Sequence, residues 1–339
     1  MRSLLRRMPR LTVLRSAERT MENARLNQPY VRSTIADLTD DRMGEGNSVA
    51  IVIGAGPSLH RRQPIPLIRD SGFDGPIVTT DGALGVCLRQ GLVPHYVLCL
   101  DPHPTRVCRW FGDPELLSRS EEDNAYFRRQ EMDPYLGTDA LRRNREQLEL
   151  INHHGPMIKA ALCTSVAPAV RNRCLQAGMT LYWWNPLMDD VDEPASRTRS
   201  LYQWNKAPCL LTGGNVGTAA WVFAHQVLGA REVALVGMDL GYAPDMSVEN
   251  TQYYAELKHL FGSRFREALI HVKNPYLGET WFADPAYYWY RQCFLRLAAQ
   301  ATCITYNCTE GGTLFGKGIR WMSLKEFLSM RCAAAVHEG

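Results

Sequence analysis

The sequence predicts an α/β protein with a doubly wound, mostly parallel sheet of the Rossmann-like kind and helical insertions. One observation is the run VAIVIGAGPSL at residues 49–59, where five apolar residues, four of them β-branched, lead directly into a Gly-rich turn. Such a continuous apolar run is typical of a strand buried on both faces of a parallel sheet. The other is the alternation of similar runs with segments of helical periodicity along the rest of the chain.

The expected elements follow in chain order. Strand-like runs lie at residues 49–53, 77–80, 96–100, 158–163, 180–184, 232–237 and 303–307, and the longer helical segments at 82–90, 166–177, 215–228, 284–300 and 323–330. Asp284 and Pro285 have the residue types of a helix cap and first turn. Residues 185–208 are polar and read as a flexible active-site segment or an exposed connection.

These elements suggest a division of the chain. The sequence predicts an N-terminal helical extension at 1–48, the Rossmann-like domain at 49–322 with insertions at about 102–156 and 241–283, and a C-terminal helix and tail at 323–339. The extension is basic and carries Arg2, Arg6, Arg7, Arg10, Arg15 and Arg19. We expect it to form an amphipathic helix that packs on the domain or on a membrane surface.

Composition excludes several classes of protein. A formal net charge of only +3 on 339 residues gives the whole molecule no electrostatic match for nucleic acid. The longest apolar runs are far shorter than a transmembrane segment. The ten cysteines contain no Cys-x-x-Cys pair, which gives a zinc site little support, and a reducing cytoplasm explains them most simply.

The turn after the first strand predicts a phosphate site. Gly54 and Gly56 allow a sharp turn and close approach to a ligand, while Pro57 suits the first turn of a helix. Ser58 adds a hydroxyl where a helix N-terminus attracts phosphate. The alternative is a tight strand–helix turn without a ligand. The third glycine of the dinucleotide fingerprint is absent from GAGPSLH, which counts against an ordinary NAD site.

Three strands end in a carboxylate, at Asp81, Asp101 and Asp239. Parallel strands present their carboxyl ends at one edge of the sheet, and carboxylates gathered there can hold Mg²⁺. The alternative is that each Asp caps the helix or turn behind it.

The segment at residues 211–218 is a fifth candidate element. Gly213, Gly214 and Asn215 lead into an apolar helix, so their backbone N–H groups can face an anion or a base. An ordinary helix start with Asn215 as cap is the equal alternative. The aromatic run at residues 287–290 has helical spacing and is predicted to be core, with a base-stacking platform as the alternative.

Several motifs occur together in a fixed order: GAGPSL, TTDGAL, GLVPHYVLCLDPHP, LTGGNVGTAA, GAREVALVGMDLGY and NCTEGG. Over residues 49–315 this ordered set resembles the archaeal-type 6-hydroxymethylpterin diphosphokinase-like family. That family also includes the central domain of motility accessory factor glycosyltransferases. Residues 81–101 are also similar to thiamine pyrophosphokinases, whose acidic motifs bind Mg²⁺ and ATP.

The resemblance assigns roles to the candidate residues. It makes Gly54, Gly56, Pro57 and Ser58 a phosphate turn, Asp81 and Asp101 metal or substrate ligands, and Gly213, Gly214, Asn215 and Asp239 the lining of a nucleotide or acceptor pocket. Asp81, Asp101 and Asp239 are then the candidate catalytic residues.

The resemblance implies a transferase that uses Mg²⁺ to pass a diphosphoryl group from ATP to a hydroxyl acceptor. The first alternative is a glycosyltransferase that uses a nucleotide-activated sugar such as a CMP-nonulosonic acid, with a small-molecule or glycan acceptor. The second alternative is a non-catalytic nucleotide-binding protein.

Overall fold

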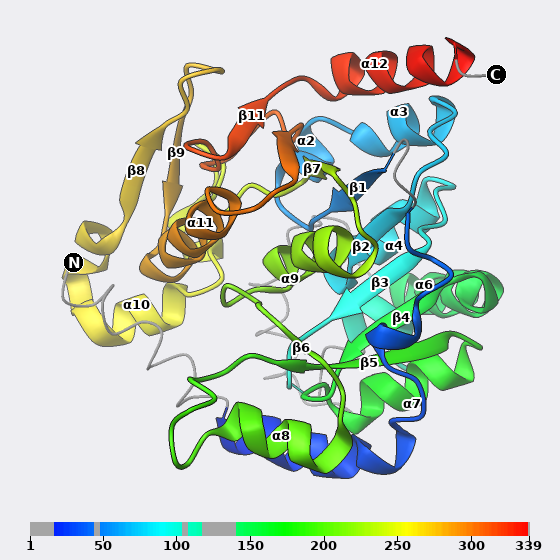
Figure 1. The fold of residues 1–339 in the computed structure, drawn as a ribbon. Helices are drawn as coiled ribbons and strands as arrows, with labels where there is room; N and C mark the ends of the chain where they lie inside the picture. Colours follow the sequence, from blue (N-terminus) through cyan, green and yellow to red (C-terminus); the bar gives the residue numbers. More distant parts are fainter. Residues whose placement is uncertain (1–16, 44–47, 104–107, 117–139, 338–339) are drawn as a thin grey trace.

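The computed structural model describes residues 17–43, 48–103, 108–116 and 140–337 (Figure 1). These residues form a nine-stranded sheet in the order β11-β10-β7-β1-β2-β3-β4-β5-β6, and each pair of neighbours is parallel. The strands are β1 (Val49–Ile53), β2 (Ile77–Thr80), β3 (Tyr96–Cys99), β4 (Lys159–Cys163), β5 (Thr180–Pro186), β6 (Cys209–Leu210), β7 (Glu232–Val236), β10 (Ile304–Asn307) and β11 (Ile319–Trp321). The predicted α/β doubly wound fold is confirmed.

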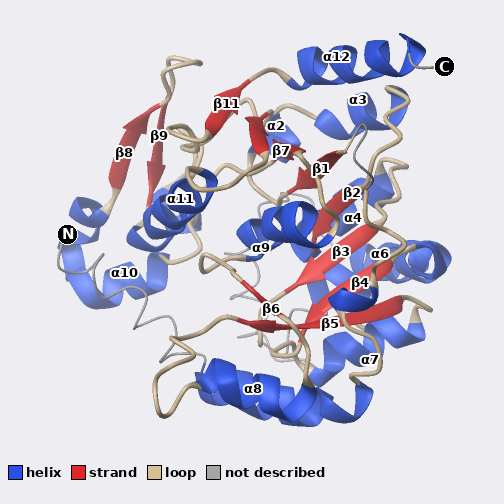
Figure 2. Ribbon diagram, in the orientation of Figure 1, coloured by secondary structure: helices blue, strands red, loops and turns tan. Residues whose placement is uncertain are grey.

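Helices cover both faces of this sheet (Figure 2). They are α2 (Ser58–Arg61), α3 (Pro64–Asp70), α4 (Asp81–Arg89), α6 (Ala140–His154), α7 (Pro168–Gln176), α8 (Arg197–Asn205), α9 (Val216–Val222), α10 (Tyr254–Phe261), α11 (Pro285–Ala298) and α12 (Leu324–His337). Residues 17–27 are also helical. A separate antiparallel hairpin joins β8 (Ile270–Lys273) to β9 (Thr280–Ala283). Among the described helices, none is long and apolar enough to span a bilayer.

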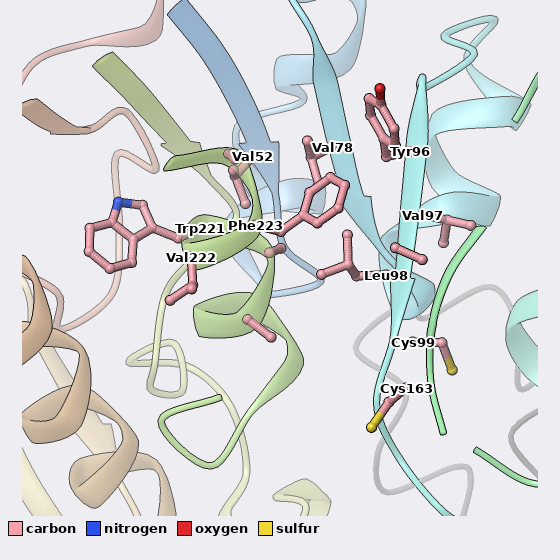
Figure 3. Close-up of a cluster of buried hydrophobic side chains, with 14 of the residues drawn as sticks. Val52, Val78, Tyr96, Val97, Leu98, Cys99, Cys163, Trp221, Val222 and Phe223 are labelled. Carbon is pink, nitrogen blue, oxygen red and sulfur yellow. The ribbon is translucent and has the colours of Figure 1, made fainter. Parts of the chain in front are cut away.

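The central strand β1 is buried on both faces, as its apolar run predicts. Ala50 and Val52 belong to the core beneath α9, whereas Ile51 and Ile53 belong to a second core with residues of α3 and α12. In Figure 3, Val52, Val78 and Leu98 from β1, β2 and β3 point toward Phe223, which follows α9. The two cores fix the position of β1, and therefore the position of the turn that follows it.

The order of the strands reverses at β1. From β1 the chain adds strands outward to β6, and it then returns through α9 to β7 on the other side of β1. Ile53 is therefore paired with Thr79 of β2 on one side and with Val236 of β7 on the other. The carboxyl ends of β1 and β7 form the crevice where open parallel sheets bind their ligands.

The structure corrects one expectation within residues 185–208. β5 continues to Pro186, and α8 occupies Arg197–Asn205. Asp189 accepts hydrogen bonds from the N–H groups of Arg197 and Thr198, and Ser196 caps the same helix. Short polar side chains at the N-terminus make a helix out of a sequence with little apolar periodicity.

Candidate functional site

A cleft of about 1010 Å³ opens at the carboxyl edge of the sheet. The loops that follow β1, β2, β3, β6 and β7 line it, together with α10 from the second insertion and α11, which follows that insertion. Nine of the predicted site residues line this cleft: Gly54, Gly56, Pro57, Asp81, Asp101, Gly213, Gly214, Asn215 and Asp239. Ser58 is buried just behind its lining.

The glycine turn is packed tightly against the end of β7. The N–H of Gly54 donates to the carbonyl of Val236 at 2.8 Å, and the N–H of Gly56 donates to the carbonyl of Gly237 at the same distance. A Cβ atom on Gly56 would lie 2.1 Å from Oδ2 of Asp239 and 2.6 Å from the Gly237 carbonyl oxygen. The close approach that requires glycine here is therefore an approach to β7.

Asp239 occupies the position that an anion would take at the N-terminus of α2. Its Oδ2 accepts the N–H of Ser58 at 3.2 Å, and its Oδ1 accepts the Ser58 hydroxyl. Burial raises the pKa of Asp239 to about 7, and the two Ser58 hydrogen bonds oppose that rise. Ser58 and Asp239 thus bind each other, which gives both residues a structural role at the base of the cleft.

Asp81 and Asp101 lie at the ends of the neighbouring strands β2 and β3. Asp81 is the first residue of α4, is 1% exposed, and accepts the N–H of Gly82 at 2.8 Å. Asp101 is half-buried and accepts the N–H of His103 at 2.8 Å. The capping alternative thus describes part of what Asp101 does, whereas the N-cap of α4 is Thr80 and Asp81 accepts the N–H of its own neighbour in the helix. Both side chains also line the cleft.

Whether Asp81 and Asp101 could hold a metal depends on the number and type of ligands around them. No group of three or more His, Cys, Asp or Glu side chains comes together as a metal-ligand cluster within the described ranges. Two carboxylates on adjacent strands are nevertheless the donor set with which Mg²⁺ is commonly held, because the ion keeps waters and takes its remaining oxygens from substrate phosphates. Asp81 and Asp101 are the residues that would hold a metal entering with a phosphate ligand.

The loop between β6 and α9 forms another side of the cleft. Gly213 and Gly214 have positive φ angles of 53° and 88°. Asn215 caps α9, because its Oδ1 accepts the N–H of Thr218 at 2.9 Å. A Cβ on Gly214 would lie 2.4 Å from the ring of Trp289, so this loop packs directly against α11.

An aromatic wall lies on the same cleft, at residues for which the sequence favours a core position over a base-stacking platform. Tyr253, Tyr287, Trp289 and Tyr290 all line the cleft, and Tyr290 alone is also buried to the level of a core residue. The cap by Asp284 does form, since its Oδ1 accepts the N–H of Tyr287 at 2.9 Å. That cap fixes where α11 begins. The spacing of residues 287 and 290 then places both on one face of the helix, and this spacing was the feature of the sequence from which the wall could have been predicted.

The N-terminal extension contributes to the site through residues 17–27. Arg19 and Thr20 line the cleft. The side chain of Asn23 donates to the Ser165 carbonyl at 2.7 Å, and that of Asn27 donates to the Thr164 carbonyl at 2.9 Å. These bonds attach the helix to the loop after β4. The sequence predicts an amphipathic helix on the domain or on a membrane surface, but the Arg-rich residues 1–16 lie outside the described residues.

The comparisons with known proteins agree with this arrangement. The model of the family described as 6-hydroxymethylpterin diphosphokinase MptE-like matches residues 18–111, which include the glycine turn, Asp81 and Asp101. No curated protein matches the chain significantly.

Among solved structures, the chain is similar to a MAf glycosyltransferase from Magnetospirillum magneticum AMB-1, with 16% sequence identity and a TM-score of 0.55. The match covers 95% of this chain and 42% of that protein, so this chain spans less than half of its length. The resemblance predicted from the sequence is confirmed in both parts: residues 18–111 match the diphosphokinase-like family model, and the chain shares its fold with a MAf glycosyltransferase.

Proposed function

We propose that this chain is a nucleotide-dependent transferase whose donor binds across the ends of β1, β2 and β3. The observation that carries the proposal is the placement of Asp81 and Asp101, which end adjacent strands and line one cleft at the point where the strand order reverses. The family model that matches residues 18–111 supports the same reading.

The reaction we propose is diphosphoryl transfer from ATP to a hydroxyl acceptor. The acceptor oxygen forms a bond to the β-phosphorus while the bond from that phosphorus to the α–β bridging oxygen breaks, and AMP leaves with that oxygen. His103 lines the cleft two residues after Asp101 and is the candidate to accept the hydroxyl proton. Asp81 and Asp101 would hold Mg²⁺, which neutralises phosphate charge when bound.

The geometry revises the role of the glycine turn in this proposal. The N–H groups of Gly54, Gly56 and Ser58 donate to β7 or to Asp239. The turn therefore shapes the floor of the cleft, and phosphate charge is offset mainly at the ends of β2 and β3. We assign Asp239 first to the floor of the cleft, because Ser58 donates to both of its carboxylate oxygens.

A second candidate is a glycosyltransferase that uses a nucleotide-activated sugar. The similarity of fold over 95% of the chain to a protein titled a MAf glycosyltransferase favours it. In this case the same strand ends bind the nucleotide, and the aromatic wall binds the acceptor.

A thermal-shift titration of the full chain with ATP, CMP and a CMP-sugar, each with and without Mg²⁺, separates these candidates. Diphosphoryl transfer predicts a shift with ATP that depends on Mg²⁺ and is lost in Asp81→Asn but kept in Asp74→Asn, a control at an exposed position. AMP release with a hydroxymethylpterin is then the activity test. A shift with CMP and no metal effect would favour the glycosyltransferase, and no nucleotide shift at all would favour the non-catalytic alternative.

A further inference from the structure

The rings of the aromatic wall pack against one another at steep angles. Ring centroids of Tyr253 and Tyr287 are 6.3 Å apart at an interplanar angle of 65°, and those of Tyr287 and Tyr290 are 5.8 Å apart at 77°. Trp289 meets Tyr290 at 5.4 Å and 52°. A planar heterocycle is best held between parallel rings. Rings that contact one another at these steep angles leave no parallel slot for such a heterocycle, but their outer sides line the cleft, where a compact cation can meet them.

The rings are held in place before any ligand arrives. The hydroxyls of Tyr253 and Tyr290 are 3.1 Å apart, and the hydroxyl of Tyr287 donates to Oε1 of Gln252 at 2.8 Å. Behind Trp289 lies the backbone of Gly214, too close to admit a Cβ atom. A ligand therefore meets a formed wall, which lowers the entropic cost of binding.

Two acidic residues, Asp284 and Glu256, line the same cleft as this wall. Asp284 is fully buried, where its Oδ2 accepts the Tyr242 hydroxyl at 2.7 Å and its Oδ1 accepts the N–H of Tyr287 at 2.9 Å. Among the lining residues that the structure describes, Arg19 is the only Lys or Arg, and it lies on the helix that binds the loops after β3 and β4. Aromatic faces are themselves negative, so rings and carboxylates attract a cation together.

We infer that the wall formed by Tyr253, Tyr287, Trp289 and Tyr290 binds an ammonium group on the molecule that accepts the transferred group. The inference deepens the proposed function and depends on it only for the ligand's role as acceptor. The recognition itself comes from cation–π contact and the two nearby carboxylates. A neutral sugar stacked on the same rings is the competing ligand. A sugar would bind without any requirement for positive charge, and this difference distinguishes it from an ammonium group.

The first experiment compares choline with 3,3-dimethylbutan-1-ol, its neutral isostere, by calorimetric titration of the full chain without nucleotide. The isostere has the same shape but lacks the charge, so we expect it to bind about ten-fold more weakly than choline. Equal binding of the two, tighter binding of glucose than of choline, or no binding of choline would overturn the inference. Because nucleotide is absent, the result is independent of the outcome of the nucleotide titration.

Two variants locate the site. Trp289→Leu should weaken choline binding about ten-fold, whereas Tyr288→Leu should leave it unchanged, because Tyr288 is on the same helix but does not line the cleft. Glu256→Gln removes one charge from the helix surface without changing its shape. It should weaken binding of choline and leave binding of the neutral isostere the same. If Trp289→Leu does not fold, a Glu256→Gln protein with unchanged choline affinity would still refute the proposed site.

Discussion

Oδ1 of Asp239 accepts the hydroxyl hydrogen bond of Ser58 at 2.5 Å, and both side chains are 1% exposed. The pair joins the end of β7 to the start of α2, two segments that are 181 residues apart in the chain. Thr313 reinforces it from the loop after β10, because its N–H donates to the Asp239 carbonyl at 2.8 Å. The floor of the cleft is therefore a joint of three segments: the loop after β7, the start of α2 and the loop after β10.

This joint predicts a pH dependence of stability. The pKa of Asp239 is raised from 3.8 to about 7, so between these values the folded protein holds a proton that the unfolded chain has released. Stability should therefore fall as pH rises from about 5 to 8, on the order of 1–3 kcal/mol. Asp284, with a pKa raised to about 6, acts in the same direction. Urea unfolding at several pH values measures the slope.

The variant that isolates Asp239 is Asp239→Asn, which keeps an acceptor for Ser58 and removes the buried charge. We expect its stability to fall less over the same pH range. Asp245→Asn is the control, because Asp245 is exposed and pairs with Arg61 at the surface. Equal slopes for the wild type and Asp239→Asn would contradict the role assigned to Asp239.

Asp101→Asn separates metal binding from turn capping. Asn can accept the N–H of His103 as Asp101 does, so the melting temperature without Mg²⁺ should stay within a few degrees of the wild type. The Mg²⁺-dependent shift with ATP should be lost, and any turnover should fall by orders of magnitude. Retention of both would assign Asp101 to the turn alone.

Gly56→Ala should destabilise the fold, because its new Cβ would lie 2.1 Å from a carboxylate oxygen and 2.6 Å from a backbone carbonyl. We expect a loss of about 3 kcal/mol, measured by chemical unfolding. Gly72→Ala is the comparison: its φ of 73° strains an alanine, but no atom lies within 4 Å of the added Cβ. That variant should lose only about 1–2 kcal/mol, and an equal or greater loss there would remove the packing argument for Gly56.

Asn27→Ala tests the attachment of the N-terminal helix. Asn27 donates to the carbonyls of Thr164 and Val166 and accepts from Arg171, and it is fully buried. Its loss leaves buried partners unsatisfied, so we expect destabilisation of about 2–3 kcal/mol. Gln28→Ala removes an exposed hydrogen bond to Trp204 and should cost less than about 1 kcal/mol. Equal effects would mean that the helix is not held through Asn27.

The sequence predicted those parts of the molecule that depend on local pattern. The strand at 49–53, the strand at 77–80 and the carboxylates behind the strands follow from apolar runs and turn residues a few positions apart. The partner of Ser58 does not, because a pairing across 181 residues leaves no local pattern. The sequence therefore predicts a glycine turn that is open to a ligand, whereas in the structure the N–H groups of Gly54 and Gly56 donate to the end of β7.

The aromatic wall escaped prediction for a related reason. Tyr287 and Tyr290 have the spacing of a core face, and aromatic residues on such a face usually pack against the sheet. Here Tyr253, from the second insertion, pairs with them and leaves one side of the rings on the cleft. The β8–β9 hairpin was also missed, since half of the residues in β8 are exposed and none is buried.

The position of β1 has a consequence for how the chain folds. One edge of β1 pairs with β2, the next strand in the chain, but the other pairs with β7, which begins at Glu232. During synthesis that second edge has no native partner until about 180 further residues have been made. An unpaired, wholly apolar central strand is prone to associate with other chains, so the growing chain is most exposed to aggregation over this interval. Pairing of β7 with β1 ends this exposure, and it also completes the floor of the cleft.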